Sequence, residues 1–133
     1  MTGIVVAGHG SYADGILSAI ELVAGKTQEI KGVNFTKGQG VEELRENLKW
    51  AITCLEAQEI LIMVDILGGS PFNVAVQLMA EGVGKRMRLV AGVNMAAVVQ
   101  AMYGRELYSF DELVPLVVRE GKGGILEVPE LTA

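Results

Sequence analysis

The sequence contains little cysteine and no excess of positive charge. Cys54 is the only cysteine, so no disulfide can form within one chain. Its place in a helical pattern predicts a core position rather than a reactive thiol. The 11 basic residues are outnumbered by 16 acidic ones, which gives a formal net charge of −5. Because a nucleic-acid partner requires a basic face, we expect no nucleic acid among the partners.

Long apolar runs and nucleotide-binding motifs are also missing. No run approaches the roughly 20 apolar residues of a membrane span, and the first apolar stretch is too short for a secretion signal, so we expect a cytoplasmic location. The P-loop pattern is absent, and the dinucleotide fingerprint GxGxxG does not follow the first apolar stretch. The one histidine and Asp65 do not make a metal site, so we expect neither metal nor cofactor.

What the chain does contain is a regular alternation of apolar patterns. Half of its 133 residues are apolar, enough for the core of a single domain over residues 1–133. The predicted strands cover residues 3–7, 30–35, 60–64 and 87–91. The predicted helices cover residues 11–25, 41–55, 70–82, 95–103 and a last segment from 109. This alternation predicts an α/β fold with an open, mostly parallel, doubly wound sheet and helices on both faces.

Two helix starts carry capping signals. Ser70 stands directly before Pro71, which suits an N-cap followed by proline at the first helical position. Ser109 and Glu112 have the spacing of a capping box at the start of the last helix.

The C-terminal residues predict an edge strand. Gly121–Gly124 favours an open hinge, and Pro129 ends the apolar segment 125–128 that follows. A lone strand of this length is not stable, so it must pair with an edge of the sheet.

Three polar side chains fall beyond the carboxyl ends of predicted strands, where open α/β sheets bind ligands. They are His9 after the first strand, Asp65 after the third and Asn94 after the fourth. Because the first and third strands are usually neighbours in this topology, we expect His9 and Asp65 to meet. Asp65 would then accept a hydrogen bond from one ring nitrogen of His9 and leave the other as a nucleophile. The plainer alternative is that the histidine fills a loop and the aspartate caps a turn.

The residues around His9 favour phosphoryl chemistry. Gly8 and Gly10 leave the ring accessible, and a helix that begins near Ser11 directs free N–H groups toward it. A nucleophilic imidazole beside such an anion site suits phosphoryl transfer.

A second glycine-rich turn could bind the phosphoryl oxygens. Gly68, Gly69 and Ser70 precede a predicted helix, so their backbone N–H groups are candidate donors. The Ser70 hydroxyl suits either an N-cap or a phosphate contact. Gly10, Gly68, Gly69 and Ser70 are therefore the expected phosphate-binding residues.

Three segments, in their order and spacing, resemble the IIA component of the mannose-family sugar phosphotransferase system. They read GIVVAGHGSYADGIL, VDILGGSPFN and AGVNMAAVVQAM, and the resemblance extends over residues 3–128. It implies that the phosphocarrier protein HPr phosphorylates the histidine and that the group passes to a IIB component, with the membrane components IIC and IID involved indirectly. It also implies a homodimer in which a C-terminal antiparallel edge strand is exchanged between subunits.

By position, His9 matches the phosphorylated histidine of that family and Asp65 matches its hydrogen-bonding aspartate. Gly69 and Ser70 match the phosphate-contacting turn. Two positions depart from the family pattern, since Gly8 stands where a threonine is frequent and Leu67 where an aromatic residue is frequent.

Two other functions could use the same crevice. One is a binding module that holds an anionic metabolite without covalent chemistry. The other is a related IIA-like subunit that supplies phosphate to dihydroxyacetone kinase. The GGSPFN and AGVN segments favour the sugar system over the kinase.

Overall fold

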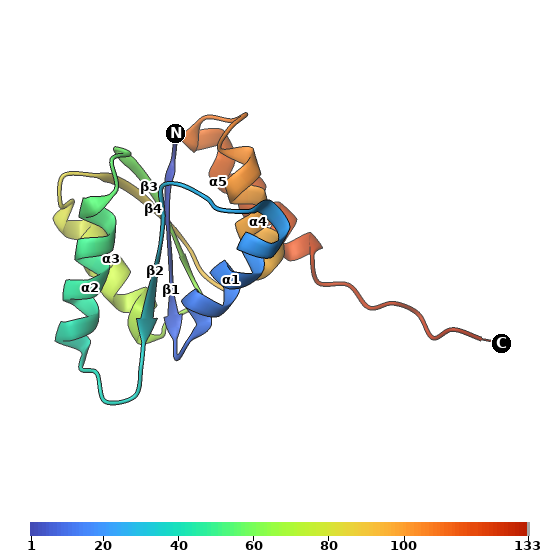
Figure 1. Cartoon of the computed structure of the whole chain (residues 1–133), viewed down its shortest axis with the longest axis horizontal. Coiled ribbons are helices and arrows are strands. Elements are labelled where there is room, and N and C mark those ends of the chain that lie inside the picture. The colour runs from blue at the N-terminus through green and yellow to red at the C-terminus, as the bar shows by residue number, and fades with distance from the viewer. Residues whose placement is uncertain (133) are drawn as a thin grey trace.

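A parallel four-stranded sheet forms the centre of the protein in the computed structural model, which describes residues 1–132 (Figure 1). Its order is β2-β1-β3-β4. The strands are β1 (Gly3–His9), β2 (Ile30–Phe35), β3 (Glu59–Val64) and β4 (Arg86–Val90). The helices are α1 (Tyr12–Ala24), α2 (Val41–Cys54), α3 (Ser70–Glu81), α4 (Met95–Gly104) and α5 (Phe110–Gly123). The predicted α/β class, the parallel sheet and the adjacency of the first and third strands are confirmed.

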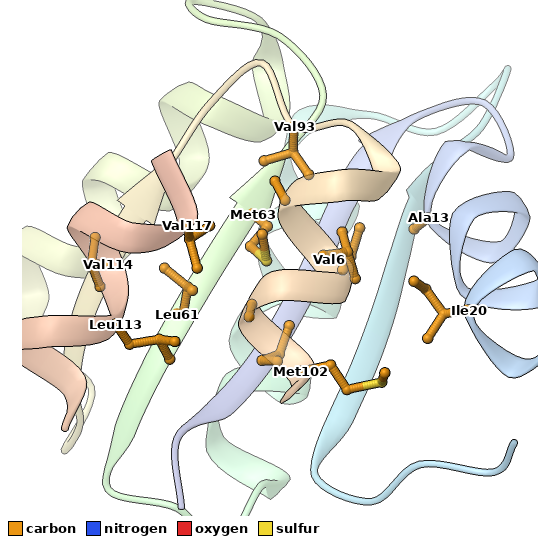
Figure 2. Packing of buried hydrophobic residues seen from close by; sticks show 14 of the residues in the cluster. Val6, Ala13, Ile20, Leu61, Met63, Val93, Met102, Leu113, Val114 and Val117 are labelled. Carbon is orange, nitrogen blue, oxygen red and sulfur yellow. The ribbon is translucent and has the colours of Figure 1, made fainter. Parts of the chain in front are cut away.

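Two apolar layers sandwich the sheet. Ile4 and Val6 of β1 pack against α1, α4 and α5, whereas Val5 and Ala7 pack against α2 and α3. All four side chains are fully buried, as expected for a central strand covered on both faces. Figure 2 shows the layer on the α4 side, where the side chains of β1 and β3 meet those of α4 and α5. Both central strands, which carry the residues of interest at their ends, are therefore held on two sides.

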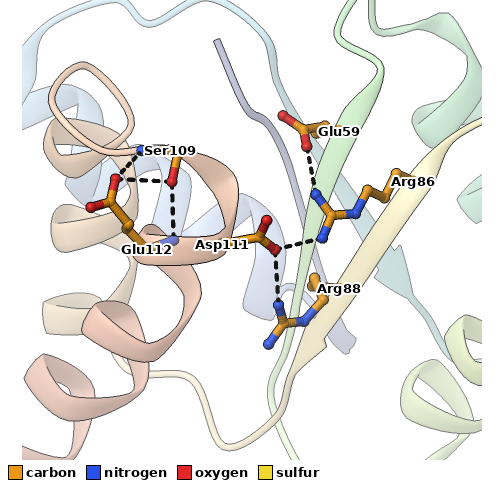
Figure 3. A network of polar contacts seen from close by, with 6 residues as sticks. All are labelled: Glu59, Arg86, Arg88, Ser109, Asp111 and Glu112. Carbon is orange, nitrogen blue, oxygen red and sulfur yellow. Dashed lines mark hydrogen bonds and ion pairs between the residues drawn. The ribbon is translucent and has the colours of Figure 1, made fainter.

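Polar contacts at the start of β4 join the sheet to α5. Arg86 donates to Glu59 of β3 at 2.8 Å and to Asp111 of α5, while Arg88 lies 3.8 Å from the same aspartate (Figure 3). These side chains are exposed, so solvent screens each ion pair and the pair adds little stability. Beside them, Ser109 forms the predicted capping box with α5.

Several boundaries and placements differ from the sequence predictions. Strand β1 continues to His9, because Gly8 and His9 extend the pairing with β2. Gly69 rather than Ser70 is the N-cap of α3, which makes Ser70 the first helical residue. Cys54 ends α2 and is exposed, so the predicted core position is wrong.

The C-terminal prediction is corrected in part. The predicted hinge is wrong, because α5 runs through Gly121 to Gly123. Residues 125–132 form neither helix nor strand and extend away from the body of the chain (Figure 1). The antiparallel edge strand and its exchange remain predictions. Among the described residues, no helix is long and apolar enough to cross a membrane.

Candidate functional site

The carboxyl ends of β1 and β3 bring His9 and Asp65 into direct contact. These strands are hydrogen-bonded neighbours, and Asp65 follows the last residue of β3. Asp65 Oδ2 lies 2.8 Å from His9 Nδ1 and accepts the His9 backbone N–H at 2.9 Å. One carboxylate oxygen therefore holds both the ring and the main chain of His9. The expected meeting of these two residues is confirmed.

The electrostatics of the pair assign the proton on the ring. Burial raises the pKa of the Asp65 carboxyl, but hydrogen bonds from the backbone and ring of His9 outweigh it, so the net pKa is lowered. The Ile66 N–H lowers the pKa of Asp65 by a smaller amount. Asp65 Oδ1 itself has no hydrogen-bond partner among residues 1–132. Asp65 is thus an ionised acceptor at neutral pH. The hydrogen-bond pattern assigns the proton of the neutral ring to Nδ1 and leaves the lone pair on Nε2.

The free edge of the His9 ring lies against the glycine turn. A Cβ atom added to Gly69 would lie 2.8 Å from His9 Cε1 and 3.3 Å from Nε2. The residue before it, Gly68, has a φ of 80°, a left-handed conformation that favours glycine. Gly68 thus shapes the turn, and Gly69 leaves room for the ring.

The same turn leads into α3, whose N-terminus begins beside the His9 ring. No side chain among residues 1–132 caps this helix, so its first backbone N–H groups can serve an anion. Ser70 is the first helical residue, and its hydroxyl has no capping role. The site therefore joins a ring nitrogen with a free lone pair, an ionised carboxylate behind it and a helix N-terminus beside it.

Two predicted site residues have other structural roles. The N–H of Gly10 donates to the Phe35 carbonyl of β2 at 2.9 Å, so this donor is already engaged. Asn94 caps α4 by accepting the Ala97 N–H at 3.0 Å, and it donates to the Gly121 carbonyl of α5 at 2.8 Å. Asn94 ties these two helices together and makes no hydrogen bond to His9 or Asp65.

Two aromatic residues at this site are not among those predicted from the sequence. Phe35, the last residue of β2, meets the His9 ring edge-on with centroids 6.1 Å apart. Tyr12, the first residue of α1, donates its hydroxyl to the Val93 carbonyl. Burial raises the pKa of Tyr12 to about 12, with a smaller contribution from the charge of Asp65. Both positions follow from the predicted elements, since Phe35 ends the strand beside β1 and Tyr12 begins the helix that follows His9.

Apolar side chains are exposed in the loop that follows Asp65. Ile66 and Leu67 form the loop between β3 and the glycine turn and are 54% and 73% exposed. Within residues 1–132, no three His, Cys, Asp or Glu side chains are grouped to bind a metal ion.

Comparisons with known proteins agree on one family. The family model described as "PTS system fructose IIA component" matches residues 3–118. The fructose-specific EIIA component of Bacillus subtilis is 30% identical over 115 residues, which are 86% of this chain and 77% of that protein. The mannose-specific EIIAB component of Escherichia coli is 32% identical over 124 residues, 92% of this chain. This chain spans only 38% of that second relative.

A solved structure gives the same result. The crystal structure of phosphotransferase system component EIIA from Streptococcus agalactiae superposes with a TM-score of 0.89 at 34% identity. The match covers 96% of this chain and 97% of that one.

Proposed function

The chain belongs to the family of PTS system fructose IIA components, and on that premise we propose that it is a cytoplasmic phosphocarrier of sugar uptake. His9 accepts a phosphoryl group from phospho-HPr and passes it to a IIB component. The observation that carries this proposal is that the two ring nitrogens of His9 have different surroundings. Nδ1 is bonded to Asp65, whereas Nε2 lies free at the exposed edge beside Gly69.

The transfer step follows from this geometry. The lone pair of His9 Nε2 attacks the phosphorus of the phosphohistidine on HPr. A new P–N bond forms while the P–N bond to HPr breaks, and the departing imidazole takes the bonding electron pair. The His9 ring, now substituted at Nε2 and protonated at Nδ1, carries positive charge that Asp65 stabilises. Transfer to IIB is the same step with His9 as the leaving group.

The N-terminus of α3 is the proposed binding site for the phosphoryl oxygens. The proposed donors are the uncapped N–H groups after Gly69 and the hydroxyl of Ser70, because a Cβ atom added to Gly69 would lie 3.3 Å from His9 Nε2. Such donors stabilise the charge on the transferred group without needing a metal ion. Gly68 and Gly10 contribute through the shape of their turns, and the N–H of Gly10 stays with Phe35.

We also propose that the functional unit is a homodimer with exchanged C-terminal segments. Ile125, Leu126 and Val128 are 79%, 82% and 71% exposed in the single chain. Strand β4 is one of the two edges of the sheet, the other being β2. It lies beside a pocket of about 120 Å³ that is lined largely by apolar residues of β4, α4, α5 and the loop between β4 and α4. Adding the partner's segment antiparallel to β4 would bury these side chains and cover the edge.

Mass spectrometry tests the carrier function directly. The protein is incubated with phosphoenolpyruvate, Enzyme I and HPr, and the intact mass is measured. We expect the gain of one phosphoryl group, and no gain for His9→Ala. Omitting HPr from the wild-type reaction is the control for direct transfer. An unchanged wild-type mass in the complete mixture would instead support a module that binds an anion without covalent chemistry.

A further inference from the structure

Tyr12 lies over Gly8, the residue that precedes His9 in β1. A Cβ atom added to Gly8 would overlap Cδ1 of Tyr12 and would lie 2.8 Å from its Cγ and 2.9 Å from its Cβ. Gly8 sits in a regular strand, where the backbone suits any residue. The tyrosine, and not the main chain, therefore excludes a side chain at position 8.

The hydroxyl of Tyr12 closes a ring of contacts behind the reactive pair. It donates to the carbonyl of Val93, in the loop between β4 and α4. The N–H of Val93 donates to the carbonyl of Val64 at 3.1 Å. The next residue, Asp65, holds His9, and only Gly10 and Ser11 separate His9 from Tyr12. The circuit thus joins the first turn of α1 to the end of β3.

Asp65 needs such support because its own bonds are few. Its Oδ1 atom is buried and has no hydrogen-bond partner within residues 1–132, so the contacts with His9 all use Oδ2. The orientation of the carboxylate therefore depends on how firmly the end of β3 and the turn after His9 are held. The Tyr12 hydroxyl stays protonated across the physiological range, because burial raises its pKa to about 12.

We propose that Tyr12 is a positioning residue for the His9–Asp65 pair and that Gly8 is its obligate complement. The ring of Tyr12 fills the space over Gly8, and its hydroxyl fixes the start of α1 against the loop after β4. His9 Nδ1 then remains hydrogen-bonded to Asp65, and His9 Nε2 remains directed at the glycine turn. This inference rests on the proposed carrier function for its kinetic test but not for its spectroscopic one.

The spectroscopic test uses the only histidine of the chain. With ¹⁵N-labelled histidine, the ring nitrogens of wild-type protein should report a proton fixed on Nδ1. Tyr12→Phe keeps the aromatic ring and removes the hydroxyl, so its signals should shift toward a mixture of the two tautomers. The control is Tyr103→Phe on the exposed side of α4, which should match wild type. Wild-type signals in Tyr12→Phe would overturn the proposal.

The kinetic test separates positioning from docking. For Tyr12→Phe, we expect kcat for transfer from phospho-HPr to fall about two- to tenfold, the range allowed by losing one hydrogen bond. The KM for phospho-HPr should not change, since the lost hydroxyl faces Val93. A raised KM with an unchanged kcat would contradict a positioning role. A wild-type protein that takes up no phosphate would refute the carrier function, and the spectroscopic result would still decide the role of Tyr12.

A double-mutant cycle tests the pairing with Gly8. Gly8→Ala should displace Tyr12 and lower kcat at least as far as Tyr12→Phe does. Once Tyr12→Ala has emptied the space, adding Gly8→Ala should cost nothing further. Circular dichroism and thermal unfolding of each variant identify any that fails to fold. If Gly8→Ala folds only when Tyr12→Ala is also present, that rescue itself supports the pairing, and failure of both variants would overturn it. Additive effects of the two substitutions would show that Gly8 and Tyr12 act independently.

Discussion

At the residue scale, the main feature is that one oxygen of Asp65 binds two groups of His9. The backbone N–H and Nδ1 share Oδ2 at 2.9 and 2.8 Å. The backbone hydrogen bond does not involve the ring, so it does not depend on the charge of the ring. In the proposed transfer, a carboxylate held in this way would orient the ring and stabilise the positive charge that a phosphorylated ring carries.

Replacing this carboxylate should slow transfer without disrupting the fold. In Asp65→Ala, the loss of a hydrogen bond to a charged ring raises the barrier by about 1.5–3 kcal/mol, or roughly one to two decades in rate. Rapid-quench measurement of transfer from phospho-HPr gives the rate constant. Asp14→Ala is the matched control, because Asp14 of α1 is hydrogen-bonded to Asn34 of β2 and makes no hydrogen bond to His9. Wild-type rates in both directions of transfer would exclude Asp65 from the mechanism.

The lowered pKa of Asp65 also links the pair to stability. A carboxyl group with a lower pKa when folded stabilises the folded state above its unfolded pKa of about 3.9. That contribution is lost as the pH falls through the folded value. Urea unfolding of wild type and Asp65→Asn should therefore show a gap in unfolding free energy at neutral pH that narrows in acid. A gap that persists unchanged to the acid limit would show that the ionised carboxylate does not stabilise the fold.

At the element scale, the sequence identified the elements better than their ends. The apolar runs predicted the strands because both faces of β1 and β3 are buried. The end of β1 was missed because Gly8 resembles a strand breaker, whereas here it accommodates Tyr12. Gly121 resembled a hinge, but it fits into α5 where a side chain would contact Ala97. Such contacts between elements leave no trace in local sequence patterns.

The glycine turn before α3 gives a prediction at the same scale. In Gly69→Ala the new Cβ atom, 2.8 Å from His9 Cε1, should displace the ring from the helix N-terminus. We expect phosphorylation to be lost or slowed at least tenfold while the chain still folds. Gly15→Ala on α1 is the matched control, since a Cβ there meets nothing within 4 Å. Wild-type phosphorylation of Gly69→Ala would show that the His9 ring can accommodate a Cβ atom at position 69.

At the scale of the whole molecule, the single chain leaves apolar surface exposed. The segment after α5 carries Ile125, Leu126, Val128 and Leu131, all more than two-thirds exposed, and β4 is an open sheet edge. An unpaired edge and a loose apolar segment both favour association. These features are accounted for together if each chain completes the sheet of its partner.

Removing the segment should therefore change the oligomeric state. We expect the 133-residue chain to be a dimer by light scattering and a chain lacking residues 125–133 to be monomeric or aggregated. Replacing Ile125, Leu126 and Val128 by serine retains the chain length and should have the same effect. A monomeric intact chain would refute the dimer, and a truncated chain that remains a clean dimer would place the interface on the helices.

We propose that Nε2 of His9 carries the phosphoryl group, because Asp65 occupies Nδ1. The most direct measurement is ¹H–¹⁵N and ³¹P NMR of the phosphorylated protein with labelled histidine. We expect coupling of phosphorus to Nε2 and a proton retained on Nδ1. Phosphorus bonded to Nδ1, or to the hydroxyl of Ser70 in place of the ring, would contradict the account.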